Sequence, residues 1–583
     1  MTAAHLASTL TAVLRSLGVD NVSPSITQST RAEHGNYASN VAFTLTKDLK
    51  KPPLAIATEI ANKVQPDEII DRVEVAKPGF INFFLRESYL LEQVKQISRG
   101  TISYIPYYLG EHHRLMIEFA HPNTLKLFHV GHLRNITTGE SLVRLFEAAG
   151  NEVIRANYQG DVGMHIAKTL WKIKQLDESN ELVKIRQSPL RDKIALIGKA
   201  YAEGNSAFES NESAKQEIIQ INRQIYAKDP DILPLWEETR QWSLEYFSAI
   251  YQRVDTTFDA YYFESQMAER GTELCHLAQE QGYLIEDDGA LIIPGETYGV
   301  DRRVFLNSLG LPTYEGKEVA LAEREFSDHG NLDACIHLVT AEQSSFFQAV
   351  FKIHELMKLA PPGAQHHQTY GWVDVKGQKM SSRKGNVLEG EWLLNEAKEQ
   401  ILRDYENTSE PTAESLAVAA VKYEFLKHGL QTKVEFDINE AVTLNGNSGP
   451  YLLYTYVRTQ SVLSKTDDSI SPTQGSENGR PDNSLDKTDL GSSSQLTPEE
   501  KALINHIPFF TEVVHDATRT IAPHLIANYL FELSQRFNLF YQQNPILQGE
   551  PHMRARRVQL TKATAQLLHH GLSLLGITTV SQM

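Results

Sequence analysis

The stretch "LMIEFAHPNTLKLFHVGHLRN", residues 115–135, decides how the chain is organised. Its first five residues are typical of a buried strand, and the sequence after residue 129 has the apolar spacing of a helix. The turn between them carries His129 and His132, three residues apart. A helix N-terminus attracts phosphate, because its free N–H groups and the helix dipole both favour negative charge. Gly131 would let the backbone approach such a ligand closely. Taken alone, two structural histidines beside a turn explain the pattern equally well.

Short apolar runs alternate with helical sequence over residues 106–400. The runs are "LMIEF", "EVIRANY", "ALIIP", "ACIHLVT" and "TYGWVDV". Strands separated by helices indicate βαβ units and a parallel sheet, so we expect a Rossmann-like domain within a multidomain α/β protein. Residues of about 168–255 are long, charged and helical in pattern, which predicts a helical insertion in this domain.

Three further regions flank the sheet domain. Residues 1–105 read as an α+β domain, residues 401–445 as a connecting helical stem, and residues 446–583 as an all-α helical bundle. Residues 464–495 are rich in Ser, Asp, Gly and Asn, and we expect them to be a disordered insertion in the bundle. The "TPEEK" sequence then predicts a new helix, with Thr497 as the N-cap residue and Glu500 completing a capping box.

Composition restricts the class of protein. The 583 residues carry a net charge of −17, which argues against sequence-blind nucleic-acid binding through the whole surface. Cys275 and Cys335 are the two cysteines, too few for a disulfide framework or a Cys-built zinc site. No apolar run reaches the ~18 residues of a membrane helix, and the N-terminus lacks the order of a signal peptide. We expect a cytoplasmic protein with no membrane partner.

A second motif, "KGQKMSSRKGNVL", covers residues 376–388. It places four basic residues in a Gly- and Ser-bearing loop after a predicted strand. Such a loop can close on a triphosphate beside a phosphate site, although a single basic loop is usually a solvated charge run. Both motifs follow strands of one predicted sheet, where α/β proteins bind ligands, and no P-loop pattern is present.

At these two motifs the sequence resembles the class I aminoacyl-tRNA synthetases. "HVGH" is similar to the HIGH signature of that class and "KMSSR" to its KMSKS signature. The resemblance implies that His129, His132 and Lys379 are catalytic. It also implies an ATP site, with Mg²⁺ accompanying the nucleotide and no dedicated protein metal site. The ATP-binding residues would be His129, Gly131, His132, Lys379, Met380, Ser381, Ser382 and Arg383. Ser382 stands where the class usually has lysine, so Arg383 or Lys384 would take over that charge.

Longer segments narrow the resemblance to the arginyl-tRNA synthetases. "HGNYASNVAFTLTK" with "VEVAKPGFINFFL" resembles their N-terminal additional domain, which helps to bind the tRNA elbow, and "GNSGPYLLYTYVR" resembles the start of their anticodon-binding domain. The segments "NYQGDVGMHIAK", "LPTYEGKEVALA" and "TAEQSSFFQ" resemble parts of the catalytic domain.

This resemblance also implies an arginine site. The residues that match arginine contacts are Glu118, Asn123, Tyr314, Glu318 and Gln343, and Glu318 stands where aspartate is usual. A carboxylate at the end of an apolar strand needs a partner, and a guanidinium is well suited to that role. From the residues alone, a structural salt bridge between Glu118 and Arg155 is about as well supported.

Contacts with tRNA are expected at both ends of the chain. The resemblance points to Asn36, Tyr37 and Asn40 in the N-terminal domain. Tyr451 and Tyr454 would stack on unpaired bases, although aromatic residues at helical spacing more often pack in a core. Arg554 and Arg557 lie in the basic stretch "MRARRVQLTK", which would contact phosphates.

These expectations describe a monomeric arginine–tRNA ligase whose partners are tRNA(Arg), L-arginine and ATP. Two alternatives remain at this point. Another class I synthetase, for lysine or cysteine, would share both motifs but would lack the N-terminal domain and the paired acids. A non-catalytic relative that binds tRNA or an amino acid would not need intact "HVGH" and "KMSSR" motifs.

Overall fold

The computed structural model describes residues 2–29, 31–102, 114–378, 388–467 and 496–583. The chain forms two compact units. The first comprises Met1–Ile105, Thr455–Val514 and Tyr529–His570, and the second comprises Pro106–Tyr454, His515–Asn528 and Gly571–Met583. No helix in these described parts is long and apolar enough to cross a membrane.

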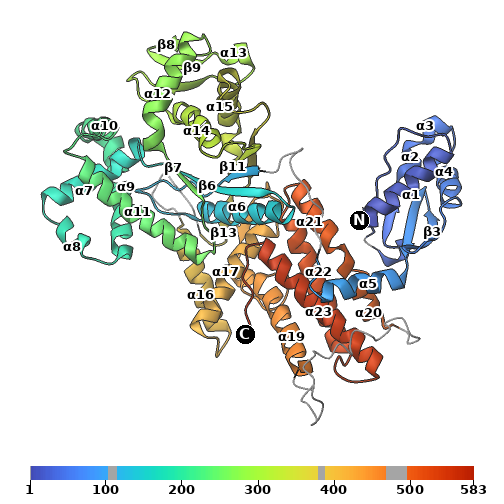
Figure 1. Cartoon of the computed structure of the whole chain (residues 1–583). Helices are drawn as coiled ribbons and strands as arrows, with labels where there is room; N and C mark the ends of the chain where they lie inside the picture. The colour runs from blue at the N-terminus through green and yellow to red at the C-terminus, as the bar shows by residue number, and fades with distance from the viewer. Residues whose placement is uncertain (1, 30, 103–113, 379–387, 468–495) are drawn as a thin grey trace, which may run out of the picture. The chain divides into compact units, whose positions relative to one another are not determined.

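A five-stranded parallel sheet is the centre of the second unit (Figure 1). Its order is β12-β11-β5-β6-β7. The strands are β5 (Arg114–Glu118), β6 (Glu152–Gln159), β7 (Ala260–Phe263), β11 (Ala334–Thr340) and β12 (Gln365–Tyr370). In the register, Glu118 on β5 lies opposite His337 on β11 and Ala156 on β6. The predicted Rossmann-like parallel sheet is confirmed.

Helices connect these strands. Helix α6 (Val130–Ala148) joins β5 to β6 and contacts both of them as well as β11. Helices α12 (Glu264–Glu280) and α14 (Tyr314–Asp328) pack against each other, and α15 (Ser344–Met357) joins β11 to β12. This arrangement places the N-terminus of α6 at the carboxyl end of β5, where ligands of such sheets bind.

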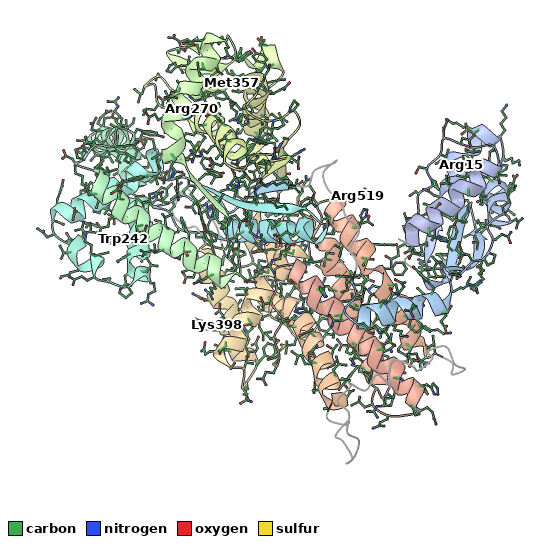
Figure 2. The ribbon with its side chains drawn as sticks, viewed as in Figure 1. Arg15, Trp242, Arg270, Met357, Lys398 and Arg519 are labelled. Carbon is green, nitrogen blue, oxygen red and sulfur yellow. The ribbon has the colours of Figure 1, made fainter. Side chains whose placement is uncertain are left out.

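Helices separate β6 from β7, in the region of about 168–255 where the sequence predicts a helical insertion. The helices are α7 (Met164–Glu178), α8 (Leu182–Arg186), α9 (Leu190–Ser210), α10 (Glu212–Tyr226) and α11 (Leu233–Arg253). Trp242 of α11, labelled in Figure 2, is only 5% exposed. The insertion therefore has apolar packing of its own.

Two of the predicted strands lie outside the parallel sheet. The "ALIIP" run forms β9 (Ala290–Ile293), which pairs antiparallel with β8 (Ile285–Asp287) and β10 (Arg303–Leu306). The "TYGWVDV" run breaks at Gly371, where a Cβ would lie 2.6 Å from the Thr432 carbonyl oxygen. Its second half, β13 (Val373–Val375), pairs with β14 (Val434–Phe436). An apolar run predicts a strand but does not identify its neighbours.

The stem region contains α16 (Gly390–Asp404), α17 (Glu410–Leu426), strand β14 and α18 (Ile438–Ala441). The stem expected to be helical therefore also contributes one strand. Short elements elsewhere in the second unit are α13 (Gly295–Tyr298) and the 3₁₀ turn η2 (Ala341–Gln343).

The first unit combines the N-terminal α+β region with C-terminal helices. Its antiparallel sheet has the order β1-β2-β4-β3. The strands are β1 (Thr27–Gln28), β2 (Tyr37–Ser39), β3 (Ile70–Ala76) and β4 (Phe80–Leu85). The helices of this region are α1 (Thr2–Ser16), η1 (Ala32–His34), α2 (Val41–Thr44), α3 (Thr46–Leu49), α4 (Pro53–Ala61) and α5 (Glu87–Ser98).

The C-terminal helices follow the predicted apolar spacing. They are α19 (Gly449–Asp467), α20 (Pro498–Ile504), η6 (Ile507–Phe509), α21 (Phe510–Arg519), α22 (His524–Gln543) and α23 (Pro551–Leu574). Thr497 caps α20 in a capping box with Glu500, as predicted. Helix α19 continues to Asp467, so residues 464–467 are helical and the predicted start of the disordered segment is wrong. Residues 468–495 lie outside the described residues.

Candidate active site

His129 and His132 hold each other at the start of α6. His129 is the N-cap residue, and its Nδ1 accepts a hydrogen bond from the backbone N–H of His132 at 3.2 Å. The backbone N–H of His129 donates in return to Nδ1 of His132 at 3.3 Å. The two rings stack with 3.7 Å between centroids. Since both Nδ1 atoms accept, both imidazoles are neutral and carry their proton on Nε2.

Electrostatics favour the same protonation state. Burial, followed by the charge of Lys126, lowers the pKa of His129 to about 4. Burial, followed by the charge of His129, lowers the pKa of His132 well below 6.5. At neutral pH the pair therefore offers two N–H donors and no positive charge.

Gly131 is needed for this arrangement. A Cβ at residue 131 would lie 2.9 Å from Cε1 and Nδ1 of the His129 ring. The glycine therefore makes room for an imidazole, in addition to any approach of the backbone to a ligand. A pocket of 230 Å³ opens here, lined by residues that include His121, His129, Gly131, His132, Gln343 and Trp372.

The end of the second motif and the residues just after it are fixed beside this pocket. Leu388 accepts a hydrogen bond from the backbone N–H of Val130 at 2.9 Å, and Gly390 donates one to the Phe128 carbonyl at 2.8 Å. The two predicted motifs are thus adjacent in space at this end. Lys379, Met380, Ser381, Ser382 and Arg383 themselves lie outside the described residues.

Glu118, at the carboxyl end of β5, is only 2% exposed. Its Oε1 lies 3.3 Å from Nδ1 of His121 and 3.4 Å from Nδ1 of His337. Burial raises the pKa of Glu118, but the nearby His337 and His121 outweigh it and lower the pKa to about 2. Arg155, the alternative partner, instead pairs with Glu140 at 3.3 Å and Glu147 at 2.7 Å.

Two more carboxyl groups from α14 lie in the same buried region. Glu318 is 8% exposed and Glu325 is fully buried. Burial and the charge of Glu118 raise the pKa of Glu318 to about 8. The same two causes raise the pKa of Glu325 well above 4.5. The region therefore holds more acidic groups than it can keep ionised without an added cation.

The other predicted arginine contacts lie around these acids. Asn123 forms a parallel bridge with Gly160, and a Cβ at residue 160 would collide with the Asn123 amide. Tyr314 is 53% exposed, and its ring centroid lies 4.8 Å from Nζ of Lys317. Gln343 is exposed in η2 and lines the same pocket as the two histidines.

Sequence reasoning missed several charged neighbours. His121 and His337 flank Glu118, and the buried side chain of Lys317 forms an ion pair with the buried Glu264. His337 follows from no motif, because the "ACIHLVT" run reads only as a strand. A histidine within a buried strand was the one available signal, since such a side chain needs a polar partner.

The predicted tRNA contacts separate into accessible and buried residues. Asn40 is exposed, and Tyr451, Tyr454 and Arg554 are partly exposed. Asn36 is partly buried and uses its amide within the first unit, donating to Asn505 at 2.8 Å and accepting from the Leu85 N–H at 2.9 Å.

Two of the predicted tRNA contacts are corrected by their burial. Tyr37 is 2% exposed and its hydroxyl donates to Glu512 at 2.7 Å. Arg557 is 5% exposed and its Nε donates to Glu500 at 2.9 Å. Both side chains are used inside the fold, because each has a carboxylate partner that the sequence pattern did not reveal.

Family models match most of the chain. Residues 95–438 match the family of tRNA synthetases class I (R), catalytic domain. Residues 452–583 match the DALR anticodon binding domain, and residues 4–85 match the arginyl tRNA synthetase N terminal domain. The fold and the site thus define a class I aminoacyl-tRNA synthetase. The chain belongs to the arginyl-tRNA synthetase family.

Individual relatives are similar over nearly the whole length. An arginine–tRNA ligase of Bdellovibrio bacteriovorus is 28% identical over 581 residues, covering 97% of this chain and 95% of the relative. The enzyme of Fusobacterium nucleatum is 29% identical over 576 residues, with 96% and 95% covered. Among solved structures, arginyl-tRNA synthetase of Thermus thermophilus matches with a TM-score of 0.78 at 24% identity, covering both chains fully. That of Plasmodium falciparum has a TM-score of 0.77 at 21% identity, with 100% of this chain and 99% of the other covered. The two structures share the fold.

Proposed function

We propose that the protein is an arginine–tRNA ligase. It activates L-arginine with ATP to give arginyl-adenylate and pyrophosphate, and it transfers the arginyl group to the 3′-terminal adenosine of tRNA(Arg). The observation that carries the proposal is the buried acid pair Glu118 and Glu318 beside the pocket of the two histidines. His121 joins the two parts of the site, since it lines that pocket and lies 3.3 Å from Glu118.

ATP is held at the N-terminus of α6. The neutral rings of His129 and His132 donate their Nε2–H groups to phosphate oxygens, and these donors stabilise charge that develops as pyrophosphate leaves. Mg²⁺ accompanies ATP and is held by phosphate oxygens and water. By resemblance, Lys379, Met380, Ser381, Ser382 and Arg383 also bind the triphosphate. The hydrogen bond between Leu388 and Val130 supports this role, because it holds the last residue of that motif at the start of α6.

The guanidinium of arginine is recognised by charge. Glu118 and Glu318 accept its N–H groups, which matches the planar, multiply donating shape of that cation. Asn123, Tyr314 and Gln343 orient the rest of the amino acid, and the position of Gln343 in the lining of the pocket that contains His129 and His132 supports this role. No covalent protein nucleophile is needed, because the carboxylate of arginine attacks the α-phosphate directly.

The tRNA is bound by surface residues of both units. Asn40, Tyr451, Tyr454 and Arg554 have the exposure that such contacts require. The net charge of −17 means that binding depends on local patches and is sensitive to salt. The protein works as a monomer in the cytoplasm.

A direct aminoacylation assay tests this function. Purified protein, ATP, Mg²⁺, total tRNA and labelled arginine should give acid-precipitable arginyl-tRNA, while labelled lysine and cysteine should give none. Charging with lysine or cysteine would instead identify another class I synthetase. Binding of tRNA without any charging would identify a non-catalytic relative.

A further inference from the structure

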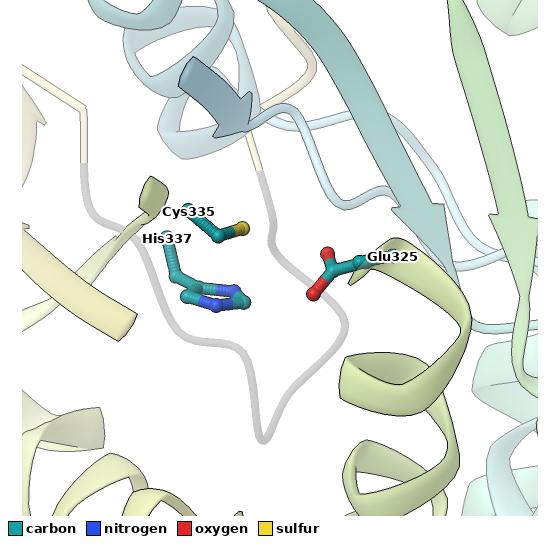
Figure 3. Close-up of side chains that lie close together, drawn as sticks. All are labelled: Glu325, Cys335 and His337. Carbon is teal, nitrogen blue, oxygen red and sulfur yellow. The ribbon is translucent and has the colours of Figure 1, made fainter. Parts of the chain in front are cut away.

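Glu325, Cys335 and His337 form a cluster of metal-binding side chains outside the residues assigned above. One potential ligand atom from each lies within 4.8 Å of the others. Cys335 and His337 are two residues apart on β11, so they project from the same face of the strand. Figure 3 shows both pointing toward the carboxylate of Glu325, which comes from α14. Glu325 and Cys335 are 0% exposed and His337 is 1% exposed.

Polar atoms in this cluster lack partners. Within the described residues, neither carboxylate oxygen of Glu325 has a hydrogen-bond partner, and Nδ1 of His337 has only the long approach of Glu118 Oε1, at 3.4 Å. A fold seldom leaves buried polar atoms side by side without close partners unless a ligand binds them. Each of these atoms can donate a lone pair to a cation.

The other nitrogen of His337 is fixed in the way that metal-bound histidines usually are. Nε2 lies 2.6 Å from Oε1 of Gln365 on β12. An amide oxygen only accepts, so Nε2 carries the proton and Nδ1 faces the cluster. Metal-ligating histidines commonly donate their second N–H to such an oxygen, which sets the ring orientation.

We propose that Glu325, Cys335 and His337 bind a zinc ion. A thiolate, an imidazole and a carboxylate are the ligands that Zn²⁺ selects, whereas Mg²⁺ prefers oxygen alone. Water would complete the coordination of the ion, because Glu118 is assigned to the guanidinium. Binding replaces the thiol proton of Cys335 and any proton on Glu325 and Nδ1 of His337, and these protons pass to solvent.

The site would connect α14 to β11, and its His337 lies 3.4 Å from Glu118 of the proposed arginine pocket. The sequence predicts no dedicated metal site, because it shows no cluster of metal-binding residues. One cysteine suffices when histidine and glutamate complete the set, and a spacing of ten residues between Glu325 and Cys335 matches no zinc motif. The inference does not depend on the proposed function.

Cobalt binding tests the site directly. Full-length protein would be stripped of metal with a chelator and titrated with Co²⁺, which reports a thiolate ligand by a charge-transfer band in the near ultraviolet. Wild type should develop this band to a plateau at one Co²⁺ per chain, and added Zn²⁺ should abolish it. C335S should lose the band. C275S is the matched control, since Cys275 is also 0% exposed but lies outside the cluster, and it should keep the band.

Two further measurements decide the matter if C335S fails to fold. In E325Q, zinc retained after gel filtration should fall from about one per chain to near zero. In Q365L, zinc affinity should fall about 10–100-fold, because the histidine loses its orienting partner. The proposal is overturned if wild type shows no thiolate–cobalt band, or if E325Q and C335S retain as much zinc as wild type. Either result would mean that any metal found is adventitious.

Discussion

The Nδ1 atoms of His129 and His132 each accept the backbone N–H of the other residue, at 3.2 Å and 3.3 Å. Protonation of either ring at Nδ1 would break one of these hydrogen bonds. The lowered pKa of His129, about 4, and that of His132, well below 6.5, keep the pair neutral above about pH 5. Activity should therefore be insensitive to histidine titration near pH 6.5.

The pH profile of arginine-dependent ATP–pyrophosphate exchange checks this. For a base with a depressed pKa, the neutral form is lost only as pH falls toward the folded value. We expect that titration of these histidines does not lower the exchange rate between pH 7.5 and pH 6. A limb near pH 6.5 in wild type that is absent from an H129N variant would contradict the assignment.

Glu118→Gln should weaken arginine binding while sparing ATP. The variant keeps the size of the side chain but removes the charge that faces the guanidinium. Losing one partner of a buried charged hydrogen bond costs about 2–5 kcal/mol, so the arginine KM should rise at least about ten-fold. Steady-state kinetics would measure it. E273Q is a control, since Glu273 pairs on the surface with Arg270, labelled in Figure 2. An unchanged arginine KM in E118Q would remove Glu118 from the pocket.

Glu318 should make arginine binding depend on pH. Its pKa of about 8 means that the group is largely protonated at neutral pH, while the guanidinium favours the carboxylate. The arginine KM should fall as pH rises from 7 to 9, and E318Q should remove this dependence. In the ligand-free protein, a rise in pH instead lowers the free energy of unfolding. The stabilising contribution of protonated Glu318 is present below its ordinary pKa of 4.5 and is lost as pH rises through about 8. If the arginine KM of wild type and that of E318Q change equally with pH, Glu318 does not cause the pH dependence of arginine binding.

Residues 468–495 should be dispensable for chemistry. These residues have few apolar side chains, and a change in the length of a connection alters its closure cost only slightly. Replacing them with a short Gly/Ser linker, while keeping α19 intact to Asp467, should leave aminoacylation within about two-fold. A large fall in kcat, with the melting temperature unchanged, would show that the segment takes part in function.

Much of this fold follows from local patterns. The strand–turn–helix around residue 129 and the capping box of Thr497 and Glu500 depend on neighbouring residues, and the structure contains both. Hydrogen-bond and ion-pair partners that lie far along the chain cannot be predicted from such local patterns. Tyr37 meets Glu512, 475 residues away, and for this reason an aromatic side chain expected to contact tRNA is buried.

The same limit applies within the candidate site. The acids at residues 118 and 318 were expected from the resemblance, but His337 and Glu325 were not, because they come from a strand and a helix with no motif. The sequence around Arg557 predicts a basic patch, but in the structure this side chain donates to Glu500. Long-range pairing decides whether a charged residue faces solvent or a core, and composition does not contain that information.

The most direct test of the central claim is discrimination between arginine and citrulline, an uncharged analogue of nearly the same shape. ATP–pyrophosphate exchange in the presence of tRNA would compare kcat/KM for arginine, citrulline and lysine. A site built around two buried carboxyl groups should prefer arginine over citrulline by about 10⁴-fold or more, since citrulline leaves those groups poorly matched. Comparable kcat/KM values for arginine and citrulline, or a preference for lysine, would contradict recognition of the guanidinium by Glu118 and Glu318.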